Sequence, residues 1–182
     1  MHAAFTLCTW LALLVTAVNA GAQTMPVGGA RPAPNPAIDS RTHLHHAAAA
    51  SRLREVQRLS EADFIRASRA PNTVVLDARS RDRYQELHIA GAVNLSFPDI
   101  TAESLARLLP DRNTRILIYC NNNFVNAPNE FARKLPAAAL NLSTFTTLYT
   151  YGYRNVFELA PLVDVRTTKL ALAGTSILAR GH

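Results

Sequence analysis

Cysteine is scarce in this sequence, which contains only Cys8 and Cys120 among its 182 residues. Cys8 lies in an N-terminal apolar segment that we expect to be removed, so Cys120 would be the single cysteine of the mature chain. A single cysteine excludes an internal disulfide, and an unpaired thiol in an oxidising compartment is a liability unless it is buried or used. Composition alone favours the interpretation that Cys120 is a small buried hydrophobic residue. A functional role for Cys120 therefore needs support from the neighbouring sequence.

Basic runs interleaved with aromatic residues are also missing, although Lys and Arg outnumber Asp and Glu by 19 to 13 and the formal net charge is +6. The basic residues are nearly all Arg and are scattered, which gives nucleic-acid binding little support. This balance fits an anionic small substrate, or a basic surface that only keeps the protein soluble. With 48% hydrophobic and 18% charged residues, we expect a folded domain with appendages.

A set of metal ligands is lacking as well. His43, His45 and His46 lie close together, but no cysteine or carboxylate ligand set accompanies them. They fall in residues 23–58, a stretch rich in Pro, Gly and Ala that predicts a linker. A short helix over residues 47–59 is expected to lead into the domain. We therefore predict neither a bound metal nor a cofactor.

The first 22 residues resemble a secretory signal peptide. Residues 3–20 are apolar or small, and small-residue cleavage sites end at Ala20 and Ala22. No Lys or Arg precedes the apolar run, and its length is close to the ~20 residues needed to span a bilayer, so an uncleaved membrane anchor is the alternative. Small and polar residues follow without a basic stop-transfer flank, which favours cleavage and a periplasmic or secreted protein.

Strand-like and helix-like segments alternate over residues 59–165. Short apolar runs predict buried strands at residues 74–77, 92–95, 115–120 and 155–159. Helices are predicted after the capping residues Ser60, Ser80 and Thr101, and over residues 127–138 and 143–151. This alternation predicts an α/β fold of three layers, a central parallel sheet with helices on both faces. Leu170 and Leu172 indicate an edge strand in a C-terminal extension, residues 166–182.

Cys120 ends the most hydrophobic of these strands, where ligands bind in open parallel sheets. The loop that follows consists of Asn121, Asn122, Asn123, Phe124, Val125 and Asn126. Its backbone N–H groups and the next helix N-terminus can converge on the sulfur. Lowering a thiol pKa from ~8.5 to 7 requires about 2 kcal/mol, and a partly buried helix terminus supplies up to ~2 kcal/mol. The sequence therefore predicts Cys120 as a nucleophile without a dedicated general base or a cation in the loop.

Three ordered segments within residues 59–162 resemble the rhodanese family. The strongest is LDARSRDRYQELHIAGAVNL, residues 76–95, which follows the family pattern D-x-R, an aromatic, and H-I-x-G-A. The matching residues are Asp77, Arg79, Tyr84, His88, Ile89, Gly91, Ala92 and Asn94. The second is RILIYC, where Cys120 takes the place of the family's persulfide-forming cysteine, and the third is GYRNVFEL, residues 152–159.

The resemblance implies a sulfurtransferase of the thiosulfate type. Cys120 would take sulfane sulfur from a small anionic donor, hold it as a persulfide, and pass it to a thiol or other thiophilic acceptor. Asp77, Arg79 and His88 are candidates for substrate contact, although a structural role is at least as well supported for each.

The loop departs from the family pattern, because Asn123 stands at the usual Gly and Val125 at the usual Arg. A related phosphatase is disfavoured, since Asn126 stands where that lineage places Arg. A loop without charged side chains does not indicate which sulfur donor the protein would use. It also leaves two alternatives: a non-enzymatic rhodanese-like binding or sensor domain that recognises a partner protein, and a Cys120 that is simply buried.

Overall fold

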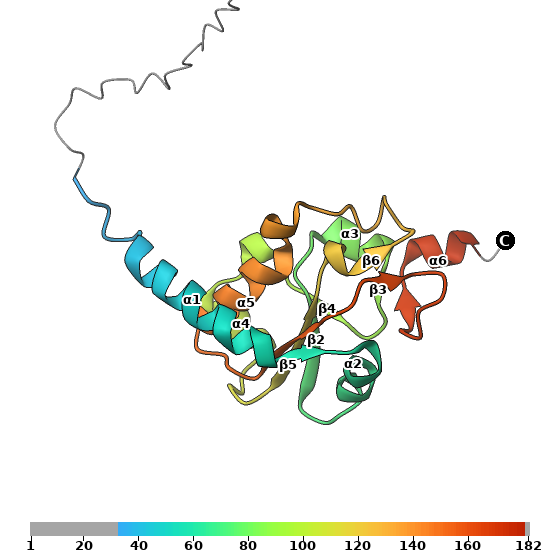
Figure 1. Cartoon of the computed structure of the whole chain (residues 1–182), viewed down its shortest axis with the longest axis horizontal. Coiled ribbons are helices and arrows are strands. Elements are labelled where there is room, and N and C mark those ends of the chain that lie inside the picture. The colour runs from blue at the N-terminus through green and yellow to red at the C-terminus, as the bar shows by residue number, and fades with distance from the viewer. Residues whose placement is uncertain (1–32, 181–182) are drawn as a thin grey trace, which may run out of the picture. The chain divides into compact units, whose positions relative to one another are not determined.

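Five parallel strands form the central sheet of the computed structural model, which describes residues 33–180 (Figure 1). Their order across the sheet is β1 (Arg58–Leu59), β7 (Val156–Leu159), β5 (Arg115–Tyr119), β2 (Thr73–Asp77) and β4 (Val93–Asn94). Every pairing in this sheet is parallel. The predicted α/β fold with a central parallel sheet is confirmed. The predicted signal peptide and Cys8 lie outside the described residues.

Helices cover both faces of the sheet because side chains alternate along its buried strands. On β5, Leu117 belongs to one hydrophobic cluster and Ile118 to the other. The first cluster includes Phe64 of α2 (Glu61–Ser68), and the second includes Phe145 and Leu148 of α5 (Leu140–Thr150). Two-sided burial explains why the strand sequences are continuous apolar runs, and it confirms the three layers.

Ser60 and Thr101 cap the helices that follow them, as the sequence predicts, and Ser80 does not. Ser60 Oγ accepts the Asp63 N–H at 3.2 Å and donates to the Asp63 carboxylate at 2.8 Å at the start of α2. Thr101 and Ser104 form a reciprocal capping box at α4 (Ala102–Leu108). Helix α3 (Arg81–Glu86) follows Ser80, whose side chain makes no capping bond. Helix α5 begins three residues before the predicted position 143.

The helix predicted over residues 127–138 is wrong. Residues 126–139, here called the covering segment, contain turns and a single short 3₁₀ turn, Pro136–Ala138. Asn126 has a left-handed φ of 65°, and Pro136 lacks the N–H that a continuing helix needs. One helical turn bond remains, from the Phe131 N–H to the Ala127 carbonyl at 2.8 Å, and burial of Phe131 in the core adds tertiary packing that holds the segment.

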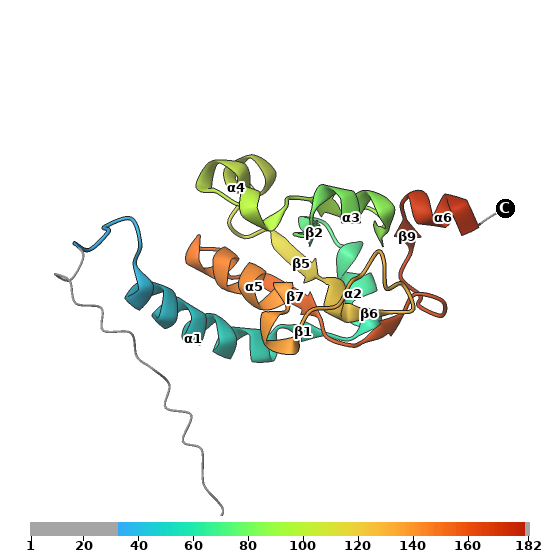
Figure 2. The same cartoon turned by 90° about the horizontal axis from the view of Figure 1, so that it is seen from above.

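The predicted linker differs from the structure from residue 40 onward, where α1 (Ser40–Val56) begins. Asp39 Oδ1 accepts the Thr42 N–H at 2.9 Å as its N-cap, and Ala50 is fully buried. Arg54 forms two hydrogen bonds of 2.7 and 2.6 Å with the carboxylate of Glu158 on β7. Figure 2 shows α1 lying beside α5. The compact domain begins at Ala37, before the helix that the pattern placed at residue 47.

The C-terminal extension packs onto the domain. β9 (Leu172–Ala173) pairs antiparallel with β3 (His88–Ile89), which confirms the predicted edge strand at Leu172. Helix α6 (Thr175–Arg180) follows and lies at the opposite end of the domain from α1 (Figure 1). No helix within residues 33–180 is long and apolar enough to cross a membrane.

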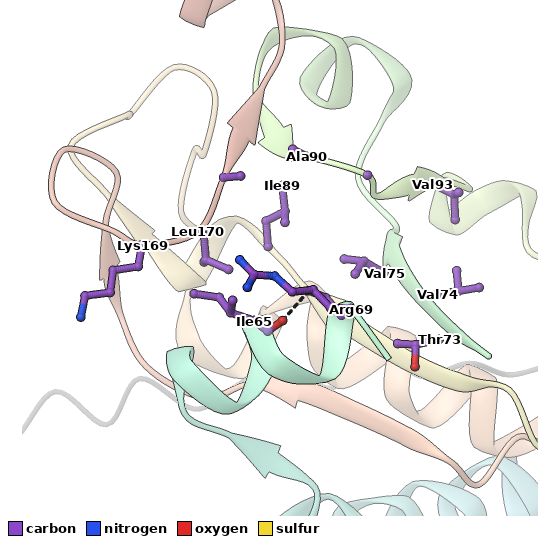
Figure 3. A pocket seen from close by; sticks show the side chains of 13 residues that line it. Ile65, Arg69, Thr73, Val74, Val75, Ile89, Ala90, Val93, Lys169 and Leu170 are labelled. Atoms are coloured by element: carbon purple, nitrogen blue, oxygen red, sulfur yellow. Dashed lines mark hydrogen bonds between the residues drawn. The ribbon is translucent and has the colours of Figure 1, made fainter. Parts of the chain in front are cut away.

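A pocket of about 320 Å³ lies between α2, the first residues of β2 and the C-terminal extension (Figure 3). Thr73, Val74 and Val75 line it on β2, and Lys169 and Leu170 line it on the extension. Cys120 follows the last residue of β5, which runs parallel to β2 with Thr73 opposite Arg115. This pocket therefore lies toward the opposite end of the sheet from the cysteine.

Candidate active site at the end of strand β5

Cys120 directly follows β5 in an extended backbone conformation, with φ −147°, and only 1% of its surface is exposed. Asn121–Asn123 form a single 3₁₀ turn. Phe124 and Val125 then form β6, which pairs with β8 (Val163–Asp164). Strand β6 thus ends the loop early, because the buried Phe124 ring stacks on Phe131 at 4.1 Å. The loop is therefore three residues long, shorter than the predicted six.

The structure gives the Cys120 thiol a raised pKa, opposite in direction to the expectation of a pKa lowered toward 7. Burial raises the pKa most, and the carboxylate of Glu158 raises it further. The backbone N–H groups of Asn141, Asn122 and Leu140 act in the opposite direction. Desolvation of the charged form exceeds the stabilisation from these donors, so the closed site favours the neutral thiol.

Two of the three backbone N–H groups that lower the pKa of the Cys120 thiol belong to the first turn of α5. The residue before this helix, Ala139, offers no side-chain cap. The first N–H groups of a helix have no partner within the helix, so Leu140 and Asn141 are free to face the sulfur. A helix N-terminus therefore does lie beside the sulfur. It belongs to α5, which follows the covering segment in the sequence, and not to a helix directly after the loop.

Asn123, at the family's usual Gly position, ties the cysteine to two neighbouring elements. Its Oδ1 accepts hydrogen bonds from the Cys120 N–H at 2.9 Å and from Asn141 Nδ2 at 3.1 Å. Its Nδ2 donates to the Leu159 carbonyl at the end of β7, at 2.7 Å. A side-chain amide with both ends occupied holds the turn without requiring a left-handed backbone at this residue.

Asn121 and Asn122 hold the covering segment against the turn that follows the cysteine. Asn121 Nδ2 donates to the Ala132 carbonyl at 2.6 Å. Asn122 Nδ2 donates to the Lys134 carbonyl at 2.8 Å, and the Lys134 N–H donates back to Asn122 Oδ1 at 3.0 Å. The side chains of the three consecutive asparagines therefore position the backbone around the cysteine, while the backbone N–H of Asn122 favours the Cys120 thiolate. Asn126, the last residue of the predicted loop, instead donates from Nδ2 to Asp164 Oδ2 at 2.8 Å.

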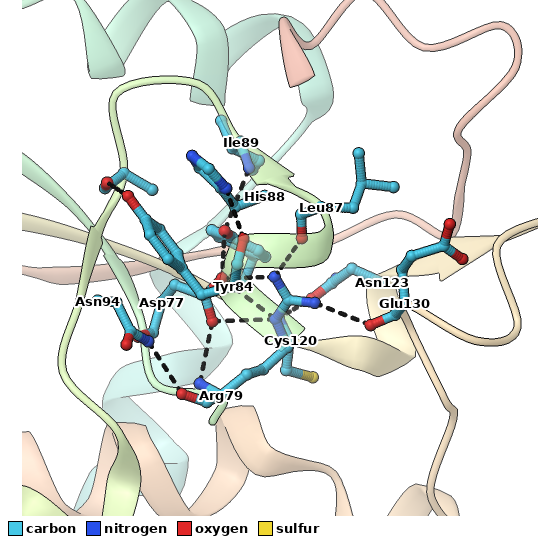
Figure 4. Close-up of polar contacts among 12 residues, drawn as sticks. Asp77, Arg79, Tyr84, Leu87, His88, Ile89, Asn94, Cys120, Asn123 and Glu130 are labelled. Atoms are coloured by element: carbon cyan, nitrogen blue, oxygen red, sulfur yellow. Dashed lines mark hydrogen bonds and ion pairs between the residues drawn. The ribbon is translucent and has the colours of Figure 1, made fainter. Parts of the chain in front are cut away.

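Asp77 and Arg79 form a buried ion pair beside the strand end (Figure 4). The closest approach, Arg79 Nη2 to Asp77 Oδ2, is 2.6 Å. The guanidinium also donates to the carbonyl of Leu87 at 2.6 Å and to that of Glu130, in the covering segment, at 3.0 Å. Arg79 is thus committed to protein groups, and the pair anchors the backbone around the site.

A second pocket, of about 500 Å³, adjoins the cysteine loop. Asn121, which follows Cys120 in the sequence, and Leu140, whose backbone N–H favours the Cys120 thiolate, line one part of it, and Phe97 and Pro98 line another. Lys134 reaches it from the covering segment. It lies at the carboxyl ends of the parallel strands, where this class of sheet binds ligands. No cluster of His, Cys, Asp or Glu within the described part of the chain could hold a metal ion.

Comparison with known families decides the identity of this domain. A model of the rhodanese-like domain family matches residues 60–161, which is more than half of the chain. The chain belongs to the rhodanese-like domain family. The match begins after α1 and ends before β8, so this rhodanese-like domain carries an added N-terminal helix and a C-terminal extension.

Several known proteins are similar to this rhodanese-like domain. Thiosulfate sulfurtransferase PspE of Escherichia coli K12 is 35% identical over 46 residues, which cover 25% of this chain and 43% of that protein. The BH2092 protein from Bacillus halodurans is 20% identical over 71% of this chain and 85% of its own, with a TM-score of 0.48. A rhodanese with anions from E. coli is 22% identical over 56% and 98%, with a TM-score of 0.38. The match to PspE spans less than half of that relative's length.

His88 of the rhodanese-like domain makes contacts with its own turn. Its Nδ1 lies 2.6 Å from the carbonyl oxygen of Tyr84, and its ring stacks on the Tyr84 ring at 3.9 Å (Figure 4). The Tyr84 hydroxyl donates to the Ala92 carbonyl at 2.8 Å. These contacts hold together the turn that carries the family's H-I-x-G-A pattern, and they describe a structural histidine.

Sequence reasoning missed Leu140, Asn141 and Lys134 at the rhodanese-like site. The first two begin α5, and Lys134 falls within the helix that was wrongly predicted. The one local signal was Ala139, which leaves the next helix without a side-chain cap and so leaves its first N–H groups free. Nothing in the local sequence shows that these groups return to Cys120.

Proposed function

We propose that this protein is an exported sulfurtransferase that carries sulfane sulfur as a persulfide on Cys120. One observation carries the proposal: the backbone N–H groups of Asn122, Leu140 and Asn141 each lower the pKa of the Cys120 thiol and so favour its anionic form. Such donors stabilise a developing or resident anion, as an oxyanion hole does. Membership of the rhodanese-like family and the distant similarity to a thiosulfate sulfurtransferase support the same chemistry.

The reaction has two displacement steps on sulfur. In the first, the Cys120 thiolate attacks the outer sulfur of a donor such as thiosulfate, an S–S bond to Cys120 forms, and sulfite leaves with the electron pair of the broken bond. In the second, an acceptor thiolate attacks the outer sulfur of the persulfide. The bond to Cys120 breaks, and Cys120 leaves as a thiolate. Neither step requires a metal or a general base beyond solvent.

Activation of Cys120 is coupled to opening of the covering segment. In the closed structure, burial raises the thiol pKa. Displacing residues 126–139 would admit solvent, remove part of the desolvation, and leave the N–H groups of α5 to stabilise the thiolate. The pocket of about 500 Å³ that borders Asn121 and Leu140 is the route by which a substrate would reach the sulfur.

Burial of Cys120 favours a second candidate function, a binding or sensor domain that recognises a partner protein through the loop. Residues 121–126 contain no cation to hold an anionic donor. In this alternative the thiol stays covered, and the surface formed by the loop and the covering segment contacts the partner.

Intact-mass measurement separates the two functions. Purified protein is incubated with thiosulfate or with polysulfide, alongside the Cys120→Ser variant. Sulfur transfer predicts a gain of one sulfur atom in the wild type only, and loss of that sulfur when a thiol is added. Equal labelling of both proteins, or no labelling of either, would overturn the transferase proposal.

Export is tested independently of the chemistry. N-terminal sequencing of the protein from a periplasmic or secreted fraction is expected to begin near residue 21 or 23, as cleavage after Ala20 or Ala22 requires. Recovery of intact Met1 in the membrane fraction would instead show that the leader is an anchor.

A further inference from the structure

The main chain of Lys134 is hydrogen-bonded to Asn122, the middle residue of the 3₁₀ turn that follows Cys120. Asn122 Nδ2 donates to the Lys134 carbonyl at 2.8 Å, and the Lys134 N–H donates to Asn122 Oδ1 at 3.0 Å. One side-chain amide thus satisfies both backbone groups of one residue, which restrains its position relative to the loop. The side chain of Lys134, in contrast, makes no hydrogen bond or ion pair with any residue in the described range 33–180.

The pocket beside the loop contains other charged residues, but its arginines are already engaged. Arg79 is paired with Asp77, and Arg83 is paired with Glu86 at 2.7 Å. Asp99 also lines the pocket and opposes an anion there. Lys134 is therefore the cation of this pocket whose charge remains available to a ligand. It stands near the loop that lacks the cationic residue usual in the family.

The size and walls of the pocket indicate an organic ligand. Its volume of about 500 Å³ is in the range of sites for organic small molecules and far exceeds an inorganic thiosulfate ion. Phe97, Pro98 and Leu140 provide apolar surface, and the Ser80 hydroxyl, which makes no capping bond, adds a polar group. A short carbon chain with one anionic end matches this combination.

We propose that Lys134 is a specificity-determining residue that pairs with the carboxylate of a small organic thiol, and that this thiol is the sulfur acceptor. The proposal rests on the proposed function, since the thiol accepts sulfur from the Cys120 persulfide. The thiol sulfur forms a bond to the outer sulfur while the bond from that sulfur to Cys120 breaks. The thiol reacts as its thiolate after losing its proton to solvent, the electron pair of the broken bond stays on Cys120 as a thiolate, and the transferred sulfur keeps the persulfide proton, giving an organic persulfide. Lys134 takes no part in bond making and acts by holding the acceptor.

The sequence offers a matched pair of variants, because Lys134 and Lys169 are its two lysines. Lys169 lines the pocket at the opposite end of the sheet, so Lys169→Met removes the same charge away from the site. Full-length protein is first loaded with sulfur by polysulfide and checked by intact mass. The rate constant for unloading is then measured with mercaptopropionate and with mercaptoethanol, which differ in carrying a carboxylate or a hydroxyl group.

We expect Lys134→Met to slow unloading by mercaptopropionate about tenfold and to leave mercaptoethanol within about twofold of wild type, as the loss of one charge-assisted contact requires. Lys169→Met should change neither rate constant. Equal slowing with both thiols, or no change with either, would overturn the assignment of Lys134.

A binding measurement keeps this test separate from the proposed function. Methylthiopropionate, which cannot accept sulfur, is titrated into wild type and Lys134→Met while NMR shifts are followed. Weaker binding to the variant supports the carboxylate site even in a protein that takes up no sulfur, in which case only the transferase proposal fails. Equal binding to both proteins would contradict the role of Lys134.

Discussion

The hydroxyl group of Tyr119 donates a 2.5 Å hydrogen bond to Oδ2 of Asp77, its partner in register on the adjacent strand. The same hydroxyl accepts the N–H of Ile89 at 3.2 Å, and the same carboxylate receives Arg79. Tyr119 immediately precedes Cys120. The family motif around Asp77 therefore supports the end of the strand that carries the sulfur, and it does so with groups that are fully buried.

Removing members of this buried network should reduce stability. Tyr119→Phe should lower the free energy of unfolding by about 1.5–3 kcal/mol, because a hydrogen bond to a charged group is lost. Arg79→Met should cost about 3–5 kcal/mol, since it leaves the Asp77 carboxylate buried without its cation. Urea unfolding measures both. The control is Arg66→Met, which breaks the exposed Asp63–Arg66 pair and should leave the free energy of unfolding nearly unchanged. An Arg79→Met variant as stable as Arg66→Met would contradict the prediction.

The pair between Arg54 and Glu158 should hold α1 on the domain. Glu158 is 1% exposed and also contacts Arg58. Arg54→Met should therefore lower the free energy of unfolding by about 2–3 kcal/mol, which is less than the loss expected for a fully buried pair. Adding Glu158→Gln to that variant should recover part of the loss, because the unpaired charge is removed. A double-mutant cycle in urea measures the coupling. Arg52→Met, on an exposed part of the same helix, is the control, and additive effects of the two changes would refute the coupling.

The raised pKa of Cys120 predicts how its rate of alkylation changes with pH. A free cysteine thiol has a pKa of about 8.5 to 9.0, and burial raises the pKa of Cys120 in the native protein. Alkylation by iodoacetamide should therefore rise with a midpoint above pH 9 in the native state and near 9 in urea. The folded state holds the proton more tightly, so the associated stability is present below pH 9 and is lost as pH rises toward the native pKa. Wild type should lose stability relative to Cys120→Ser over that range. A native midpoint below 9 would show that the site is open in solution.

Gly174 should be required for docking of the C-terminal extension. Its φ is +129°, and a Cβ at this position would lie 2.4 Å from the carbonyl oxygen of Glu86. Gly174→Ala should displace the extension from β3 and loosen the backbone around the exposed Lys169, so that trypsin cleaves there faster. Gly91→Ala is the control, because its φ of +81° brings only backbone strain of about 1 kcal/mol and no atom lies within 4 Å of the added Cβ. Equal trypsin resistance of the two variants would refute this role.

The sequence by itself determined four of the five strands of the central sheet and the starts of α2, α3 and α4. Apolar runs such as residues 115–120, and caps such as Ser60 and Thr101, are local signals, because burial on both faces and the first turn of a helix each depend on neighbouring residues. The family motif and the position of Cys120 at a strand end were readable for the same reason.

Tertiary structure decided the state of the sulfur and what surrounds it. Helix α1 depends on a carboxylate distant in sequence, Glu158, and the covering segment on side chains of the asparagine loop. Whether Cys120 is a thiol or a thiolate depends on a balance between burial and the N–H groups of α5. That balance is set by groups that folding brings together from separate parts of the chain, so no pattern of neighbouring residues contains it.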